Sequence, residues 1–198
     1  MAETKFTADT AGRYEELDVR DRALVRLIAA GDRLAFDHLF RAYRPRLERF
    51  LGQLMRTHQV LDELIDDTML VVWRRAGTFN NSSRVSTWIF AIAHRHALKS
   101  LRRSPAQGSG QVDEAGAATD NQPERSLIDK QQRDLVRTAL ATLSSEQRLV
   151  VELTYYHGCA YREIAQIVGC PVDTVKTRMF HARRKLRLAL QAQEMEGD

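Results

Sequence analysis

The sequence predicts an all-α protein in which two small helical domains are joined by a flexible linker. Apolar residues recur at helical spacing along most of the chain, and no stretch shows the alternation that is typical of a β-strand. One stretch without aromatic residues, 104–124, separates the helices into two groups. With 43% apolar residues, a chain of 198 residues can give each group its own hydrophobic core. The expected segments are an N-terminal tail (1–19), a first domain (20–103), the linker (104–124), a second domain (125–192) and a C-terminal tail (193–198).

Four helices are expected in the first domain. Over residues 20–55 the apolar spacing is interrupted at Gly31-Asp32, which indicates two amphipathic helices rather than one. A third helix begins near Leu61 and ends near Gly77, a residue type favoured at helix C-termini. The fourth, over 86–103, is apolar on every side in its first half and is expected to lie buried among the others.

The linker is bracketed by Pro105 and Pro123 and contains acidic residues but no basic one, a composition that does not form a core. Beyond it, a helix is expected over 127–143. Ser144 opens the next helix, with a glutamine three positions later in the capping-box pattern, and this helix ends at Gly158. The second domain therefore begins as a pair of short helices.

The C-terminal part shows a helix-turn-helix pattern: a short helix (161–168), a turn at Gly169-Cys170-Pro171 and a longer helix (172–190). One face of the longer helix is apolar and is formed by Val175, Met179, Ala182, Leu186 and Ala189. The opposite face carries Asp173, Thr177, Phe180 and Arg184. Six basic residues against one acidic residue favour binding in the major groove of duplex DNA. The alternative is a solvated surface helix, which would leave an exposed phenylalanine without a purpose.

Charge is segregated in the first domain, although the net charge of the chain is only +4. The predicted third helix carries an acidic patch whose members repel one another at i,i+4 spacing: Asp62, Glu63, Asp66 and Asp67. This patch favours a basic partner, and the alternative is a set of carboxylates that face water near a helix N-terminus. A metal or acid-base role is disfavoured because the inward Glu-x-x-His pattern of helical metal sites is missing.

The predicted fourth helix becomes basic in its second half, where a stripe is formed by Arg95, Lys99, Arg102 and Arg103. The polar loop before it, 80–84, offers Asn and Ser side chains that can hydrogen-bond an unstacked base. Trp88 could stack on such a base, but its apolar neighbours favour a position in the core. Nucleic acid is therefore the natural partner of this loop and helix.

Three residues of the second domain invite a metal or redox role, namely His157, Cys159 and Cys170. Two thiols and one imidazole fall short of a closed zinc site, so we expect small core cysteines, no metal and no cofactor. The first residues lack the apolar run of a signal peptide, and no stretch is long and apolar enough for a membrane span, which predicts a cytoplasmic protein. No GxGxxG, Walker or His-rich pattern is present, so neither enzymatic activity nor a small-molecule substrate is expected.

Taken in order, these features resemble a sigma factor of the extracytoplasmic-function (ECF) type, in the sigma-70 family, over nearly the whole chain. In the first half the resemblance rests on the acidic helix, the loop and the run Ser86–Ala93 that leads to Leu101-Arg102-Arg103. In the second half it rests on Leu140–Leu143, Glu163-Ile164-Ala165, Gly169-Cys170-Pro171, Thr174–Arg178 and Ala182-Arg183. The resemblance implies a domain like sigma region 2, followed by a helix-turn-helix domain like sigma region 4.

The resemblance also implies a role for each surface. The acidic helix would bind the clamp coiled coil of the β′ subunit of bacterial core RNA polymerase through Asp62, Glu63, Leu64, Asp66 and Asp67. The melted −10 promoter element would be bound by Asn80, Asn81, Ser82, Arg84, Ser86, Thr87, Trp88, Arg95, Lys99 and Arg102. The −35 element would be read as duplex by Arg162, Val172, Asp173, Thr174, Lys176, Thr177, Phe180, His181 and Arg184. The β flap of the polymerase is a further implied partner, and members of the family are commonly restrained by an anti-sigma factor.

The sequence departs from the family pattern at four of these positions. The family usually has Asp where Glu63 stands, Gln where Asp66 stands, Asn where Arg95 stands and Asp where Lys99 stands. The main alternative to a promoter-specificity factor is a stand-alone helix-turn-helix regulator. Such a regulator would need to dimerise to cover enough base pairs, and no separate dimerisation element is evident.

Overall fold

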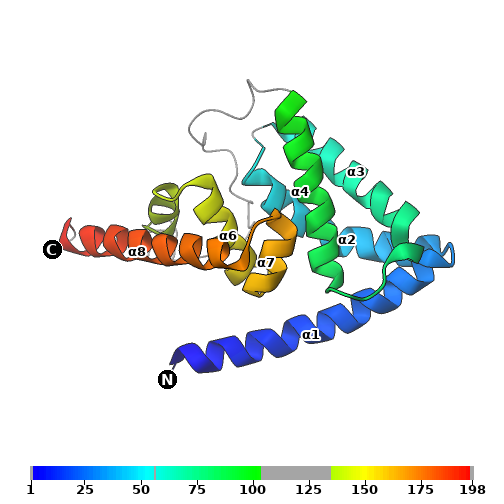
Figure 1. The fold of residues 1–198 in the computed structure, drawn as a ribbon, viewed down its shortest axis with the longest axis horizontal. Coiled ribbons are helices and arrows are strands. Elements are labelled where there is room, and N and C mark those ends of the chain that lie inside the picture. Colours follow the sequence, from blue (N-terminus) through cyan, green and yellow to red (C-terminus); the bar gives the residue numbers. More distant parts are fainter. Residues whose placement is uncertain (1, 56, 104–134, 197–198) are drawn as a thin grey trace, which may run out of the picture.

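The computed structural model describes residues 2–55, 57–103 and 135–196 (Figure 1). Regular structure in these ranges is helical and consists of α1 (Ala2–Ala29), α2 (Arg33–Gly52), α3 (His58–Arg75), the 3-10 turn η1 (Ala76–Thr78), α4 (Val85–Arg103), α6 (Ser145–Tyr155), α7 (Tyr161–Val168) and α8 (Val172–Glu196). Residues 135–141 are also helical. The predicted all-α fold class is confirmed, whereas the predicted linker 104–124 lies outside the described residues.

The boundary between α1 and α2 falls where the sequence predicts it. Asp32 is the N-cap of α2, and its carboxylate accepts hydrogen bonds from the N–H groups of Leu34 and Ala35 at 2.8 and 3.1 Å. These bonds satisfy two of the donors that the start of every helix leaves free. The beginning of α1 differs from the expected tail over 1–19, because the helix starts at Ala2. Between Ala2 and Val19 the large apolar side chains are only Phe6, Tyr14, Leu17 and Val19, too widely spaced to show a helical period.

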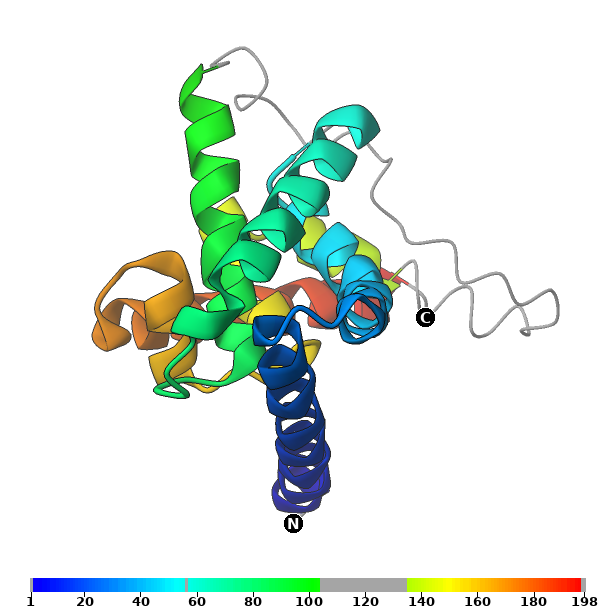
Figure 2. The same ribbon diagram turned by 90° about the vertical axis from the view of Figure 1, so that its right-hand side faces the viewer.

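The core of the first domain lies between α1, α2, α3 and α4 (Figure 2). Its largest fully buried side chains include Leu39, Tyr43, Leu47, Phe50, Leu51, Ile65, Met69, Ile89 and Phe90. Each large apolar side chain of this kind contributes about 1.5–3 kcal/mol by leaving water. The Tyr43 hydroxyl donates to the buried Asp21 carboxylate of α1 at 2.7 Å, and burial raises the pKa of Tyr43 well above its usual value. This hydrogen bond fixes α1 on α2.

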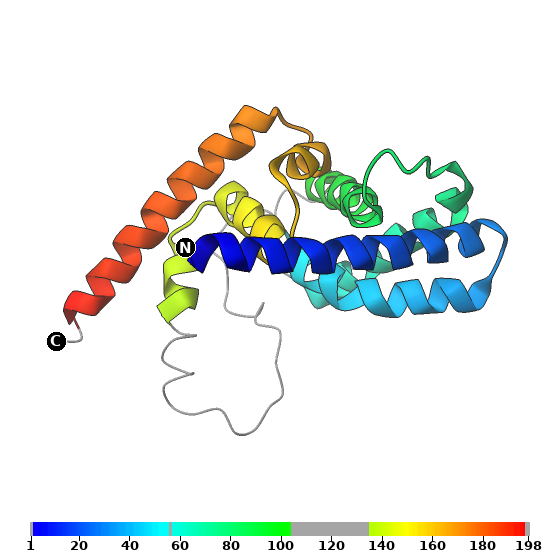
Figure 3. The ribbon, with the colours of Figure 1, turned by 90° about the horizontal axis from the view of Figure 1, so that it is seen from below.

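The second domain forms around α6, α7 and α8. Ser144 and Gln147 make the predicted capping box at the start of α6, where the serine hydroxyl accepts from the Gln147 N–H at 3.3 Å. Gly169 ends α7 in the left-handed conformation, at φ +72°, which L side chains rarely adopt. The turn sends α8 away from α7, and α8 extends far beyond the other helices of the domain (Figure 3).

The two domains contact each other mainly through α4 and α7, and α1 packs on the first domain and reaches the second at Tyr14 (Figures 1 and 3). Arg49 of α2 forms an ion pair with Glu152 of α6. The Tyr14 hydroxyl of α1 donates to the Tyr156 carbonyl at 2.7 Å, and the Tyr14 ring fills the space where a Cβ at Gly158 would lie. The φ of Gly158 is +62°, so both its backbone and its surroundings require glycine.

Within the ranges that the structure covers, no helix is both long and apolar enough to cross a membrane.

Candidate nucleic-acid interface

The exposed face of α8 is the one that the sequence predicts. Its apolar residues Val175, Met179 and Ala182 are buried against α6 and α7, as expected. On the opposite side, Phe180 is 65% exposed, and its ring lies 5.5 Å from the imidazole of His181. Because this phenylalanine does not pack in the protein's own core, its ring is available to a partner.

The residues predicted to read the −35 element gather along this face and the turn before it. Those whose side chains are exposed are Arg162, Asp173, Lys176, Thr177, Phe180, His181 and Arg184, and those that are half-buried are Val172 and Thr174. Lys176 pairs with Asp173 at 2.9 Å, one turn earlier on the same helix. The face is therefore polar and basic around one aromatic side chain, which is a composition suited to DNA.

The acidic patch lies on the exposed side of α3. The side chains of Asp62, Glu63, Asp66 and Asp67 are all exposed, whereas Leu64 is buried in the core of the first domain. Asp62 accepts a hydrogen bond from the Arg44 guanidinium of α2 at 2.8 Å. The exposed carboxylates are thus available to a cationic partner, but the side chain of Leu64 is not.

The polar loop between η1 and α4 has a defined shape. The side-chain oxygen of Asn80 accepts a hydrogen bond from the Ser82 N–H at 3.1 Å, which is an Asx turn. Asn81 has a φ of +59°, in the left-handed region that asparagine tolerates better than most residues. The side chains of Asn80, Asn81 and Ser82 are exposed. The loop therefore presents three short polar side chains to solvent.

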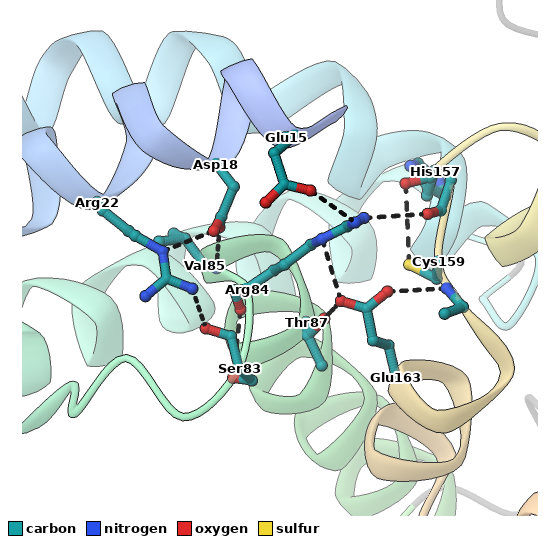
Figure 4. Close-up of polar contacts among 12 residues, drawn as sticks. Glu15, Asp18, Arg22, Ser83, Arg84, Val85, Thr87, His157, Cys159 and Glu163 are labelled. Atoms are coloured by element: carbon teal, nitrogen blue, oxygen red, sulfur yellow. Dashed lines mark hydrogen bonds and ion pairs between the residues drawn. The ribbon is translucent and has the colours of Figure 1, made fainter. Parts of the chain in front are cut away.

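Two residues of α1, which sequence analysis missed, hold this loop in place (Figure 4). The Asp18 carboxylate accepts from the Val85 N–H at 2.8 Å, and the Arg22 guanidinium donates to the Ser83 carbonyl at 3.0 Å. An i,i+4 pair of opposite charges is visible in the sequence. Its partners lie more than 60 positions away, however, and nothing in the local pattern indicates them.

The second half of α4 carries the predicted basic stripe on its surface, since Arg95, Lys99 and Arg102 are exposed. Earlier on the helix, Trp88 is half-buried and its ring lies 4.9 Å from that of Phe79. Trp88 is thus neither fully buried in the core nor fully exposed for stacking on a base, the two positions that the sequence left open. Ser86 is half-buried as well.

Two of the residues predicted to bind the −10 element contact the second domain (Figure 4). The buried Thr87 hydroxyl donates to the Glu163 carboxylate of α7 at 3.0 Å. Arg84 donates to the Gly158 carbonyl at 3.3 Å, and its Nε lies 3.5 Å from the same Glu163 carboxylate. While the domains keep this arrangement, Thr87 is closed to solvent and Arg84, whose side chain is 26% exposed, is bound to the second domain.

His157 and Cys159 are buried where the domains meet. Burial, with Arg46 and Arg49 nearby, lowers the pKa of His157 to about 3, and burial raises the pKa of Cys159 to about 12. Cys159 and Cys170 are both free thiols. Over the described ranges, no three His, Cys, Asp or Glu side chains are placed to hold a metal ion. At neutral pH Cys159 is a thiol rather than the thiolate that metal binding or disulfide exchange requires.

A helix-turn-helix with an exposed basic face, together with a helical domain that separates an acidic from a basic surface, defines a DNA-binding protein with more than one macromolecular partner. Comparison with known families agrees. Residues 39–105 match the family model "Sigma-70 region 2", and residues 133–186 match "Sigma-70, region 4". The ECF RNA polymerase sigma factor SigM of Mycobacterium tuberculosis is 32% identical over 175 residues, covering 88% of this chain and 85% of SigM. The ECF RNA polymerase sigma-E factor of Salmonella typhimurium is 27% identical over 176 residues, covering 84% and 92%.

The chain belongs to the ECF sigma factors of the sigma-70 family, which have no enzymatic activity and direct RNA polymerase to promoters. The resemblance seen in the sequence is thereby confirmed. Solved structures with the same fold include CnrH in complex with the cytosolic domain of CnrY, at a TM-score of 0.60 and 23% identity over 87% of this chain and 98% of that one. Another is RpoE of Bartonella quintana in complex with the anti-sigma factor NepR, at a TM-score of 0.59 and 24% identity over 79% and 96%.

Proposed function

We propose that this sigma factor uses three separate surfaces during promoter recognition. The acidic patch of α3 binds the clamp coiled coil of the polymerase β′ subunit, the loop 80–84 with α4 binds the melted −10 element, and α8 binds the −35 element as duplex. The second domain also contacts the β flap. The observation that carries this proposal is the separation of charge, since exposed acids lie on α3 and exposed bases lie on α4 and α8.

The acidic patch suits a basic protein surface better than it suits DNA. Its four carboxylates are exposed and repel one another, and of these only Asp62 has a cation at hydrogen-bond distance among the described residues. A basic helical surface that covers the patch relieves this repulsion. Because Leu64 is buried, the proposed contact rests on the carboxylates alone.

The −10 surface combines two kinds of contact. Arg95, Lys99 and Arg102 offer charge to the phosphates of a single strand, while the loop offers side-chain amides and a hydroxyl to base edges. Arg84 and Thr87 also belong to this surface, but Glu163 of the second domain occupies both of them. Their use therefore requires the second domain to move away from α4.

Related complexes suggest how the protein is regulated. CnrH and RpoE, which share this fold, have been solved with CnrY and with the anti-sigma factor NepR. We propose that an anti-sigma factor likewise restrains this chain by covering its polymerase-binding and DNA-binding surfaces. The proposed site of action is the cytoplasm, where polymerase and promoter DNA meet.

The direct test of the function is run-off transcription from a promoter library with purified core polymerase, with and without the protein. Specific transcripts that depend on the protein are expected. A variant with Asp62, Asp66 and Asp67 changed to Lys should lose at least about tenfold in affinity for core polymerase, or about 1.4 kcal/mol. Its affinity for a duplex that contains the −35 element of an active promoter should not fall.

Charge reversal also changes the overall charge, so the control must match it. A second variant carries Lys at three acidic positions of the first domain outside α3, namely Glu15, Glu16 and Asp37. This control should keep wild-type affinity for core polymerase. The proposal that α3 binds core polymerase and α8 binds duplex is contradicted if the two variants lose the same affinity for core polymerase. It is also contradicted if the α3 variant loses affinity for core polymerase and for the duplex to the same extent.

A further inference from the structure

The −10 loop has few contacts of its own to keep its shape. Within the loop, the Asn80 side chain bonds the Ser82 N–H, while Asn81 keeps a left-handed conformation that costs free energy for any residue with a Cβ. The three exposed polar side chains of the loop keep fixed directions only while the backbone keeps this conformation. A fixed shape therefore has to come from outside the loop.

Arg22 of α1 supplies part of that restraint. Its guanidinium donates to the Asn81 carbonyl at 3.3 Å and to the Ser83 carbonyl at 3.0 Å, so it holds the backbone on both sides of Ser82. The same group lies over the ring of Phe79, 5.9 Å from its centroid. One planar side chain with several donors thus bridges the beginning and the end of the loop.

Asp18 supplies the rest. Its Oδ1 accepts from the N–H of Val85, the first residue of α4, and so satisfies a donor that the helix start leaves free. Its Oδ2 accepts from Arg22 Nε at 2.6 Å. The Asp18 side chain is 12% exposed and that of Arg22 is 30% exposed, which limits screening of the pair by water. The carboxylate therefore fixes the guanidinium and the end of the loop together.

We propose that Asp18 and Arg22 are positioning residues for −10 recognition, which set the loop so that Asn80, Asn81 and Ser82 meet one unpaired base of the melted strand. The inference rests on the proposed −10 function of the loop. Both residues precede the matched region 2, which begins at residue 39. An open cavity of about 250 Å³ lined by Val19, Arg22, Arg26 and Asn81 lies beside the loop, so α1 contributes to the surface around it.

A positioning role and a merely structural role have different consequences. If the pair only stabilises the fold, its loss weakens binding to every −10 sequence by the same factor. If the pair positions the loop, its loss removes discrimination at the base that the loop reads and leaves discrimination elsewhere intact. The ratio between the dissociation constants for mismatched and preferred bases separates the two roles.

The test uses the full chain bound to core polymerase and fluorescent single-stranded oligonucleotides. Their sequence comes from the −10 element of the most active promoter in the run-off library, with one base changed at a time. For Arg22→Ala and Asp18→Asn, the discrimination ratio at one position should fall from about tenfold or more to less than about threefold. Ratios at the other positions, and affinity for the −35 duplex, should stay within about twofold of wild type.

Two further variants guard against misfolding and charge effects. Arg22→Lys keeps the charge but lacks the planar fork, so its discrimination should lie between those of Arg22→Ala and the wild type. Arg20→Ala removes the same charge from α1, where Arg20 is exposed and pairs with Asp21, and should discriminate like the wild type. Uniform weakening on all oligonucleotides, or unchanged ratios, would overturn the positioning role. A wild type that itself does not discriminate would overturn the proposed −10 function, and this inference with it.

Discussion

At the scale of single residues, His157 is an uncharged imidazole enclosed by aromatic rings. Its ring lies 4.5 Å from that of Phe90 and 6.5 Å from that of Phe50, both in the first domain. Because burial lowers its pKa to about 3, its 3.6 Å approach to the Glu152 carboxylate is not an ion pair at neutral pH. Its Nε2 is buried and has no hydrogen-bond partner among the residues that the structure describes. Burial in turn raises the pKa of Glu152, which Arg49 opposes.

This histidine should make stability depend on pH. Its pKa is about 3 in the folded chain and about 6.5 when unfolded, so the unfolded chain takes up the proton first as the pH falls. The stabilisation present above pH 6.5 is therefore lost between pH 6.5 and 3, with a limiting slope of about 1.4 kcal/mol per pH unit. The raised pKa of Glu152 acts in the opposite direction, because folding then favours its protonated form.

Comparison of the wild type with His157→Gln isolates the histidine from Glu152 and the other carboxylates. We expect the difference in free energy of unfolding, wild type minus variant, to decrease as the pH falls from 7 to 5. Urea denaturation followed by circular dichroism at several pH values measures it. A difference that does not change over this range would show that His157 is accessible to protons in the folded chain.

At the scale of helices, α8 and α1 show what the sequence could and could not predict. The faces of α8 follow from its apolar period, and the burial of Val175 and Met179 confirms them. In α1, by contrast, the large apolar side chains before Arg20 are too widely spaced to reveal a helix. The function of Asp18 was also hidden, because a carboxylate that caps a helix 67 positions away leaves no local pattern.

Arg184 is the basic residue of the outward face of α8 that best tests duplex binding. Replacing it with Ala removes one phosphate contact, so affinity for the −35 duplex should fall, and the slope of log K against log salt should become shallower by about 1. Fluorescence anisotropy at several salt concentrations gives both quantities. Arg41→Ala is the matched control, since it removes the same charge from α2, where Arg41 is exposed and pairs with Asp37. Equal effects of the two substitutions would mean that the outward face is assigned incorrectly.

At the scale of the whole molecule, the contact between the two domains uses side chains that also belong to the proposed −10 surface. Glu163 forms an ion pair with Arg84 and accepts a hydrogen bond from Thr87. A second ion pair between the domains joins Arg49 and Glu152. The sequence allowed both domains to be predicted, but not this contact, because its partners are 76 to 103 positions apart and belong to separate amphipathic patterns. In this arrangement Glu163 occupies two members of the proposed −10 surface, Arg84 and Thr87.

Separation of the domains should expose Cys159 and complete the −10 surface. In Arg49→Glu two acidic groups face each other, and Glu152 loses its cation. Breaking a largely buried ion pair costs about 3–5 kcal/mol, which weakens the contact between the domains. The contact should therefore open more often, and alkylation of Cys159 should accelerate at least about tenfold. Affinity for the −10 oligonucleotide should rise at the same time. The measurement is mass spectrometry of iodoacetamide labelling in a Cys170→Ser background.

Arg41→Glu reverses the same charge on an exposed part of α2 and should leave both quantities unchanged. Slow labelling of Cys159 in Arg49→Glu, with unchanged −10 affinity, would show that this ion pair does not hold the domains together.

The hydrogen bond between Tyr43 and Asp21 bears on where the first domain can be cut. The matched region 2 begins at residue 39, inside α2. A fragment that starts there would lose Val25 and Ile28 from the core and would leave the buried Tyr43 hydroxyl without its acceptor. An expressed first domain therefore needs α1 to be soluble, and its N-terminal limit follows from the structure rather than from the family boundary.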